Sequence, residues 1–175
     1  MSRRAGKSDY LPVRLPSTVA TIDASHTENI DMKSISLFLL ALLFSSMTIA
    51  AEHKVEMRNI GKDGAMVFEP AYLKVAVGDT VHFVPADMGH NSVSVLVPEG
   101  AKGWAGERNK DVTAVIDKEG VYIYRCEPHT YMAMTGVIQA GKPVNLEAAK
   151  KAAEALKPQF AVNKDRLDRY LSQVQ

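Results

Sequence analysis

The stretch Cys126-Glu127-Pro128-His129-Thr130-Tyr131-Met132-Ala133-Met134 contains one thiol, one imidazole and two thioethers within nine consecutive residues. Thiolate and thioether donors suit soft ions such as copper(I), and imidazole also binds copper(II). This combination predicts a site for a soft metal that is held in two oxidation states. A trigonal site needs one more strong nitrogen donor, which must come from another part of the chain.

His90 is the best candidate for that donor. It lies between a glycine and an asparagine in a loop between two expected strands, where a scaffold can hold an exposed functional group in place. His53 and His82 lie in or beside expected strands and are interpreted as ordinary strand-face residues. Two imidazoles, a thiolate and a weak thioether form the trigonal copper site used for electron transfer. The spacing does not decide between Met132 and Met134 as the thioether donor, because both have the same parity along the chain.

The composition is that of an ordinary globular domain. Of 175 residues, 46% are hydrophobic and 23% are charged, and 21 basic residues against 20 acidic ones give a formal net charge of +1. The chain is long enough to bury one sizeable core. A balance so close to neutral gives no reason to expect nucleic acid as a partner.

Residues 32–50 have the order of parts of a secretory signal peptide. Lys33 is the basic start, an apolar run extends over residues 37–44, and Thr48 and Ala50 occupy the two positions that cleavage requires to be small. A membrane-spanning helix is the alternative, but the apolar run is short for a bilayer and no basic cluster follows it. The sequence therefore predicts export to the periplasm, cleavage near Ala50 and no stable membrane insertion.

Residues 1–31 are polar and without periodicity, which is unusual before a complete signal peptide. We expect them to be a non-native or disordered extension, with translation starting at Met32. Export also bears on Cys126, the one cysteine of the chain. A lone cysteine cannot form an internal disulfide in an oxidising compartment, and metal binding or burial would protect it.

Short strands separated by turns follow the signal peptide. Strand patterns cover residues 54–60, 66–68, 72–77, 80–84, 93–97, 111–116, 121–125 and 135–140. Leu73, Val75 and Val77 are expected to point inward, and residues 93–97 are expected to form a buried strand. The turn at 117–120 predicts a hairpin between the strands on either side of it. Because no helix-length segment separates these strands, residues 51–142 are predicted to form an all-β Greek-key sandwich.

Two helices are predicted in the C-terminal segment 143–175. Asn145 is expected to cap a helix over residues 146–156, and Asn163 a second helix with Leu167, Tyr170 and Leu171 on one face. Helices this short are not stable alone, so we expect both to pack on the sandwich.

These features together resemble the pseudoazurins, small periplasmic blue-copper proteins within the cupredoxin family. The similar stretches are residues 64–72, 78–81, 89–91, 98–101 and 126–134, and the two helices after the sandwich also match. The resemblance implies one type 1 copper ion and single-electron transfer rather than catalysis. It implies that the equatorial ligands are His90, Cys126 and His129, and that the axial ligand is Met134.

The resemblance also places residues around these ligands. Asn91 would tie the two ligand loops together and so fix the ligand geometry, and Met66 would lie near the His129 ring. Glu127 stands where a small hydroxyl residue is commoner in the family, and its carboxylate favours the more positive copper(II) state. The remaining residues expected beside the site are Pro128 and Met132.

Members of this family exchange electrons through the exposed edge of the C-terminal ligand histidine, set in an apolar patch ringed by lysines. The implied docking face comprises His129, Ile60, Met88 and Arg125. Ile60 and Met88 stand where family members often carry lysine, so steering toward an acidic partner should be weaker. The implied partners are periplasmic redox proteins such as a nitrite or nitrous-oxide reductase, and we expect the protein to be a monomer.

Three other readings of the cysteine and histidine fit less well. Nucleophile and base pairs are usually distant in sequence, haem attachment needs a second cysteine, and structural zinc prefers four cysteine or histidine donors. The main alternative is a periplasmic copper carrier or storage protein, which would use the same soft ligands without a constrained site.

Overall fold

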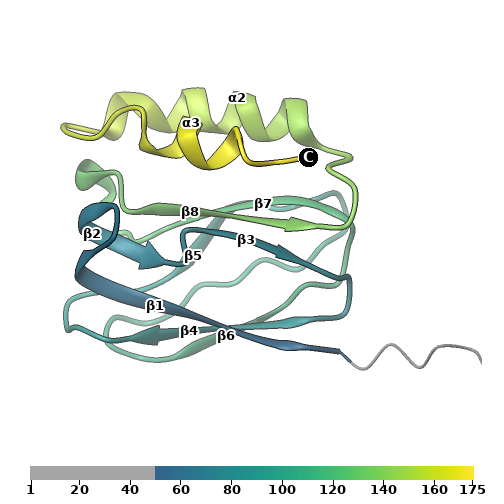
Figure 1. Cartoon of the computed structure of the whole chain (residues 1–175), viewed down its shortest axis with the longest axis horizontal. Coiled ribbons are helices and arrows are strands. Elements are labelled where there is room, and N and C mark those ends of the chain that lie inside the picture. The colour runs from purple at the N-terminus through teal and green to yellow at the C-terminus, as the bar shows by residue number, and fades with distance from the viewer. Residues whose placement is uncertain (1–49) are drawn as a thin grey trace, which may run out of the picture. The chain divides into compact units, whose positions relative to one another are not determined.

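The computed structural model describes residues 50–175, so the predicted extension and most of the signal peptide lie outside the described residues. The described part forms two four-stranded sheets and two α-helices (Figure 1). The strands are β1 (Glu52–Gly61), β2 (Gly64–Glu69), β3 (Tyr72–Val75), β4 (Thr80–Pro85), β5 (Val93–Leu96), β6 (Val112–Val115), β7 (Gly120–Arg125) and β8 (Thr135–Ala140). The helices are α2 (Leu146–Leu156) and α3 (Arg166–Leu171), and two 3₁₀ turns cover Thr130–Met132 and Lys157–Gln159.

The two sheets form the predicted sandwich. One sheet has the order β2-β1-β4-β6 and the other β3-β8-β7-β5. The turn between β1 and β2 makes a hairpin, while β1 pairs with β4, and β3 with β8, in parallel. These parallel pairs join strands that are distant in sequence, as in a Greek-key sandwich and unlike a simple meander. The predicted fold class is confirmed.

The predicted hairpin across residues 117–120 was wrong, because β6 and β7 belong to different sheets. β6 pairs with β4, and β7 lies between β8 and β5. Residues 120–124 of β7 are all buried, whereas only Ala114 of β6 is buried. A strand that is apolar on both faces needs cover on both faces, so β7 lies within the doubly covered sheet. The turn residues bend the chain but do not select its pairing partner.

An aromatic cluster fills the space between the sheets. Phe83 stacks on Trp104 with ring centroids 5.3 Å apart, and Tyr124 meets Phe68 edge-on at 4.7 Å. Such pairs add about 0.5–1.5 kcal/mol each beyond the burial of their area. Trp104 is buried and anchors the long loop before β6. Cys126 belongs to the same buried cluster, so the core supports the candidate site directly.

Two details of the expected strand burial were wrong. β3 ends at Val75, and Val77 is half exposed rather than directed inward. β5 is half-buried, with Val95 exposed, because it lies at the edge of its sheet. Alternation of apolar residues therefore identified strands but not where each strand ends or whether it lies at an edge.

The two helices cover the outer face of the second sheet, above β7 and β8 (Figure 1). The apolar residues between the helices and this sheet are Val121, Ile123, Val137, Ala149, Ala153, Leu156, Phe160 and Leu167. All six residues of β8 are consequently buried. The bounds of α2 agree with the prediction. Asn145 does not cap it through its side chain, which instead accepts from the Val121 N–H (2.7 Å) and donates to the Val121 carbonyl (2.9 Å).

Within residues 50–175, no helix combines the length and apolar character that crossing a membrane requires.

Candidate metal centre

Three side chains from two distant loops bring their donor atoms together at one end of the sandwich. Nδ1 of His90 lies 3.1 Å from Nδ1 of His129 and 3.8 Å from Sγ of Cys126. The distance between Nδ1 of His129 and Sγ of Cys126 is 3.4 Å. A point equidistant from three atoms with these separations lies about 2.0 Å from each, close to metal–nitrogen and metal–sulfur bond lengths of about 2.0–2.3 Å. The three donors therefore fit a single small metal ion.

His90 is completely buried, although the loop position had suggested an exposed side chain. Its Nε2 lies 3.1 Å from Oδ1 of Asn59. Because an amide oxygen can only accept, Nε2 carries the proton and Nδ1 presents its lone pair to the other donors. Burial lowers the pKa of His90, and the neighbouring His129 lowers it further. The imidazole is therefore held neutral, which is the form that binds a metal.

Cys126 follows the end of β7 and is also completely buried. Burial raises the pKa of its thiol, and hydrogen bonds from the backbone of Asn91 and of His129 oppose that rise. The same hydrogen bonds stabilise negative charge on sulfur. A metal that binds here displaces the thiol proton, and the site already contains donors that favour the resulting thiolate.

A tight turn holds the segment between Cys126 and His129. Oγ1 of Thr130 donates to the carbonyls of Cys126 (3.0 Å) and Glu127 (3.1 Å), and the N–H of His129 donates to the Cys126 carbonyl. His129 is partly exposed, unlike the other two donors of the triangle. Burial lowers its pKa, and the positive charge of Arg108 adds to this effect.

Burial separates the two candidate methionines. Met134 is completely buried in the core cluster that contains Cys126, and its carbonyl accepts from the Cys126 N–H at 2.9 Å. Met132 is half-buried and lies in the 3₁₀ turn. Met66 is partly buried against the same core cluster. Of the two candidates, Met134 is therefore the one whose side chain is shielded from water in the core cluster that contains Cys126.

Asn91 joins the two loops that supply the donors. Its Oδ1 accepts from the backbone N–H of Glu127 (2.9 Å), while Nδ2 donates to Oε2 of Glu127 (2.8 Å) and to the Gly106 carbonyl (3.1 Å). The side chain is 5% exposed. Glu127 is exposed and Pro128 is half-buried, both beside the triangle in sequence.

The residues of the expected docking face are largely exposed. Ile60 is 69% and Met88 72% exposed, which is unusual for large apolar side chains. A Cβ atom on Gly89, the neighbour of Met88, would lie 3.7 Å from Cε1 of His129. Arg125 is half-buried and donates to Oε1 of Gln159 at 3.0 Å.

Sequence reasoning missed two residues that support the His90 loop. Asn59 orients the imidazole, and the side chain of Asn109 accepts from the Gly89 N–H while its backbone N–H donates to the His90 carbonyl at 2.8 Å. A metal-binding histidine usually donates its second ring N–H to an acceptor. That rule predicts an acceptor for the second ring N–H of His90. It does not identify Asn59 as this acceptor, because Asn59 lies 31 residues from His90 in the sequence.

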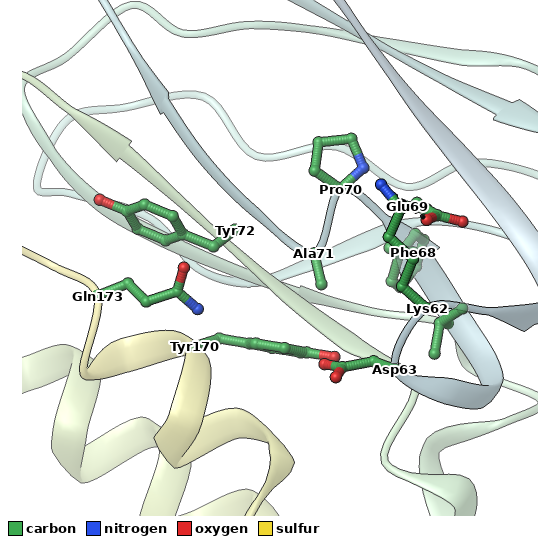
Figure 2. A pocket seen from close by; sticks show the side chains of 10 residues that line it. Lys62, Asp63, Phe68, Glu69, Pro70, Ala71, Tyr72, Tyr170 and Gln173 are labelled. Atoms are coloured by element: carbon green, nitrogen blue, oxygen red, sulfur yellow. Dashed lines mark ion pairs between the residues drawn. The ribbon is translucent and has the colours of Figure 1, made fainter.

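The other histidines of the described part make different contacts. His53 pairs with Asp79 at 2.8 Å, and His82 lies 3.1 Å from the hydroxyl of Thr113. A hollow of about 310 Å³ lies elsewhere, where Tyr170 of α3 faces Asp63 (Figure 2). Its lining contains no histidine, cysteine or methionine, so it offers no soft donors.

The sandwich and the histidine–cysteine–histidine triangle at its end define the class as a cupredoxin. Residues 55–141 match the model of a family described as copper binding proteins, plastocyanin/azurin family.

Close relatives narrow this class. The pseudoazurin of Paracoccus pantotrophus is 40% identical over 139 residues, which cover 78% of this chain and 91% of that protein. The pseudoazurin of Methylorubrum extorquens is 34% identical over 78% of this chain and 90% of its own length. The crystal structure of native pseudoazurin from Hyphomicrobium denitrificans matches with a TM-score of 0.62 and 41% identity, covering 71% of this chain and 99% of that one. The chain belongs to the pseudoazurins, a family of blue-copper electron-transfer proteins.

Proposed function

We propose that this protein is a periplasmic one-electron carrier that holds one type 1 copper ion with His90, Cys126 and His129, and with Met134 as the weak fourth ligand. The observation that carries the proposal is the donor triangle, with sides of 3.1, 3.4 and 3.8 Å. The loops that carry it are held by hydrogen bonds of Asn59 with His90, Asn91 with Glu127 and Thr130 with Cys126, none of which involves a metal.

Bound copper would supply a one-electron couple, and the chain supplies a site that changes little between the two states. Two neutral imidazoles and a thiolate suit both oxidation states. The buried core keeps water from His90 and Cys126. Because the ligands cannot relax freely, little has to move when an electron arrives or leaves.

The partly exposed His129 is the proposed route for the electron. Ile60 is adjacent to Asn59, which binds His90, and Met88 is adjacent to Gly89, which lies against the His129 ring. Exposed apolar side chains around an electron-transfer edge favour brief contact with an apolar patch on a partner. We propose that the partners are periplasmic redox proteins such as a nitrite or nitrous-oxide reductase, and that the carrier is a monomer.

Ile60 and Met88 stand where related proteins often carry lysine, and this difference gives a test of partner recognition. The association rate with an acidic partner should depend only weakly on salt, and Ile60→Lys with Met88→Lys should raise both the rate at low salt and its salt dependence. Val144→Lys, which adds the same charge at an exposed apolar residue outside this face, is the control. An equal effect of all three substitutions would place the docking face elsewhere.

The first test is colour. Copper(II) added to the exported, metal-free protein should give an intense blue or green complex that bleaches on reduction and recovers on oxidation. His90→Gln and Cys126→Ser should abolish the colour, while His82→Gln should keep it. A protein that binds copper tightly but forms a colourless complex would favour the alternative, a periplasmic copper carrier or storage protein.

The axial position has its own matched pair. Met134→Leu should change the spectrum and the reduction potential, whereas Met132→Leu should change neither appreciably. The opposite result would assign the fourth ligand to Met132.

We also propose that the protein is exported with residues 32–50 as a signal peptide and that the sandwich occupies residues 51–142. Support comes from Ala51, whose backbone N donates to the buried carboxylate of Asp79 at 2.9 Å. A chain cleaved after Ala50 would place a free ammonium at this carboxylate. Mass spectrometry of the periplasmic protein should find Ala51 as its first residue. A peptide from residues 1–31 in cell extract would contradict translation from Met32.

A further inference from the structure

Arg166 is a buried arginine whose guanidinium binds backbone oxygens instead of a carboxylate. It is 1% exposed and is the first residue of α3. Within residues 50–175, Arg166 forms no ion pair, whereas Arg169 on the same helix pairs with Asp63 and Asp165. Burying a cation without a counter-ion is costly unless hydrogen bonds satisfy it. Its carbonyl acceptors are those of Asp63, Ala65, Met66, Met132 and Ala133.

These acceptors belong to two segments that are far apart in sequence. Nη2 donates to the carbonyl of Asp63 in the β1–β2 turn at 2.9 Å, and Nη1 donates to Met66 in β2 at 2.9 Å. Nη1 also reaches Met132 (3.2 Å) and Ala133 (3.5 Å), directly before Met134. One guanidinium therefore connects the start of the sandwich with the ligand loop.

Two of the acceptors have a backbone conformation that side chains disfavour. Met66 has φ 51° and Ala133 has φ 57°, both in the left-handed region. Such residues are held in place only when their surroundings favour that conformation. The carbonyl of each accepts a hydrogen bond from Nη1 of Arg166. Asn163, just before α3, adds a second donor to the Met132 carbonyl at 3.3 Å.

Resting on the proposed function, we propose that Arg166 is a positioning residue for the copper site. Its guanidinium holds Ala133 in the left-handed conformation and thereby fixes where Met134 lies relative to Cys126. The Cys126 N–H donates to the Met134 carbonyl, so a shift of this turn changes the spacing of both sulfur atoms. Helix α3 thus takes part in setting the metal site as well as in covering the sheet.

The decisive variant is Arg166→Lys, which keeps the charge but cannot supply a planar fork to two segments. In the copper-loaded protein it should change the ratio of the two thiolate-to-copper bands and shift the reduction potential. In the metal-free protein the amides of Ala133 and Met134 should exchange with solvent about tenfold faster, because local opening of this turn no longer breaks the hydrogen bonds from the guanidinium.

Two controls lie on the same helix. Arg169→Gln removes a half-exposed charge that pairs with Asp63 and Asp165. Leu167→Ala weakens the packing of α3 without removing a hydrogen bond to the loop. Arg169→Gln should keep the wild-type band ratio and the wild-type exchange at Ala133. Leu167→Ala, whose side chain belongs to the same buried cluster as Ala133, should change both less than Arg166→Lys does. Asn163 itself has a left-handed φ of 53°, which glycine adopts readily. Asn163→Gly is therefore a milder variant that removes only one donor to the Met132 carbonyl, so exchange at Ala133 should rise severalfold.

The outcomes separate the two proposals. If the wild-type protein forms no coloured copper complex, the proposed function fails. Amide exchange in the metal-free protein still tests whether Arg166 holds the turn at Ala133 in place. If wild-type and Arg166→Lys proteins share one spectrum and one exchange rate, the positioning role is refuted. It is also refuted if Leu167→Ala alters both readouts as strongly. If Arg166→Lys does not fold, Arg166→Gln, which buries no unpaired charge, replaces it, and wild-type exchange at Ala133 in that variant overturns the proposal.

Discussion

Replacing Asn91 by alanine should loosen the two ligand loops before any metal is bound. The side chain is 5% exposed and makes three hydrogen bonds, two to Glu127 and one to the Gly106 carbonyl. A hydrogen bond contributes about 0.5–1.5 kcal/mol, and more when one partner is charged. Because Glu127 is exposed, its charge is screened. We therefore expect Asn91→Ala to lower the free energy of unfolding by about 2–3 kcal/mol.

Equilibrium unfolding of the metal-free protein in urea measures this loss. The midpoint should fall while the slope with denaturant stays constant, because the surface exposed on unfolding is unchanged. Copper affinity should fall as well, by up to about tenfold for each 1.4 kcal/mol of loop ordering that the metal must now supply.

Glu127→Gln is the matched control. It keeps the backbone donor and a side-chain oxygen and removes only an exposed charge, so it should cost less than about 1 kcal/mol. A loss below about 1 kcal/mol for Asn91→Ala, or equal losses for both variants, would refute the idea that Asn91 pins the loops.

Three further predictions concern charge. Glu127→Thr should raise the reduction potential by about 20–40 mV, since an exposed charge contributes about 0.5–1 kcal/mol to a one-electron couple; voltammetry that shows an unchanged or lower potential would count against this. The pKa values of His90 and His129 are lowered in the folded state from the ordinary 6.5, so below about pH 6.5 the unfolded chain takes up protons first. The metal-free protein should lose stability as pH falls from 7 to 5.5 in urea titrations, and a flat or rising profile would contradict the assignment. Asp79→Asn should cost about 1–3 kcal/mol in a chain that starts at Ala51 and less in one that carries an added residue before it; equal losses in both would exclude an ion pair with the terminal ammonium.

Local sequence could predict most of the fold because strands, turns and helix α2 depend on nearby residues. It failed for the pairing of β6 and β7, since the turn at 117–120 sets a bend and not a partner. The partner was decided by burial on both faces of β7, which depends on helices that begin 21 residues after that strand ends.

The candidate site divides in the same way. Cys126 and His129 are three residues apart, so their proximity follows from a single turn, and the spacing of the motif is enough to predict it. Asn59 and Arg166 act from other elements, at 31 residues from His90 and 33 from Ala133. An exposed asparagine and an arginine in a charged helix carry no sequence signal for such roles, because the contacts exist only after the chain has folded.

The helical cover of the second sheet also bears on the order of folding. Helices α2 and α3 follow every strand that they cover, so they leave the ribosome after β7 and β8. Until they dock, the outer face of this sheet, with Val121, Ile123 and Val137, is open to solvent and to other chains. A sheet face of this kind is prone to aggregation in a folding intermediate. A chain kept unfolded until its last helix is available avoids that intermediate, which is the condition that export through a membrane as an unfolded chain would impose.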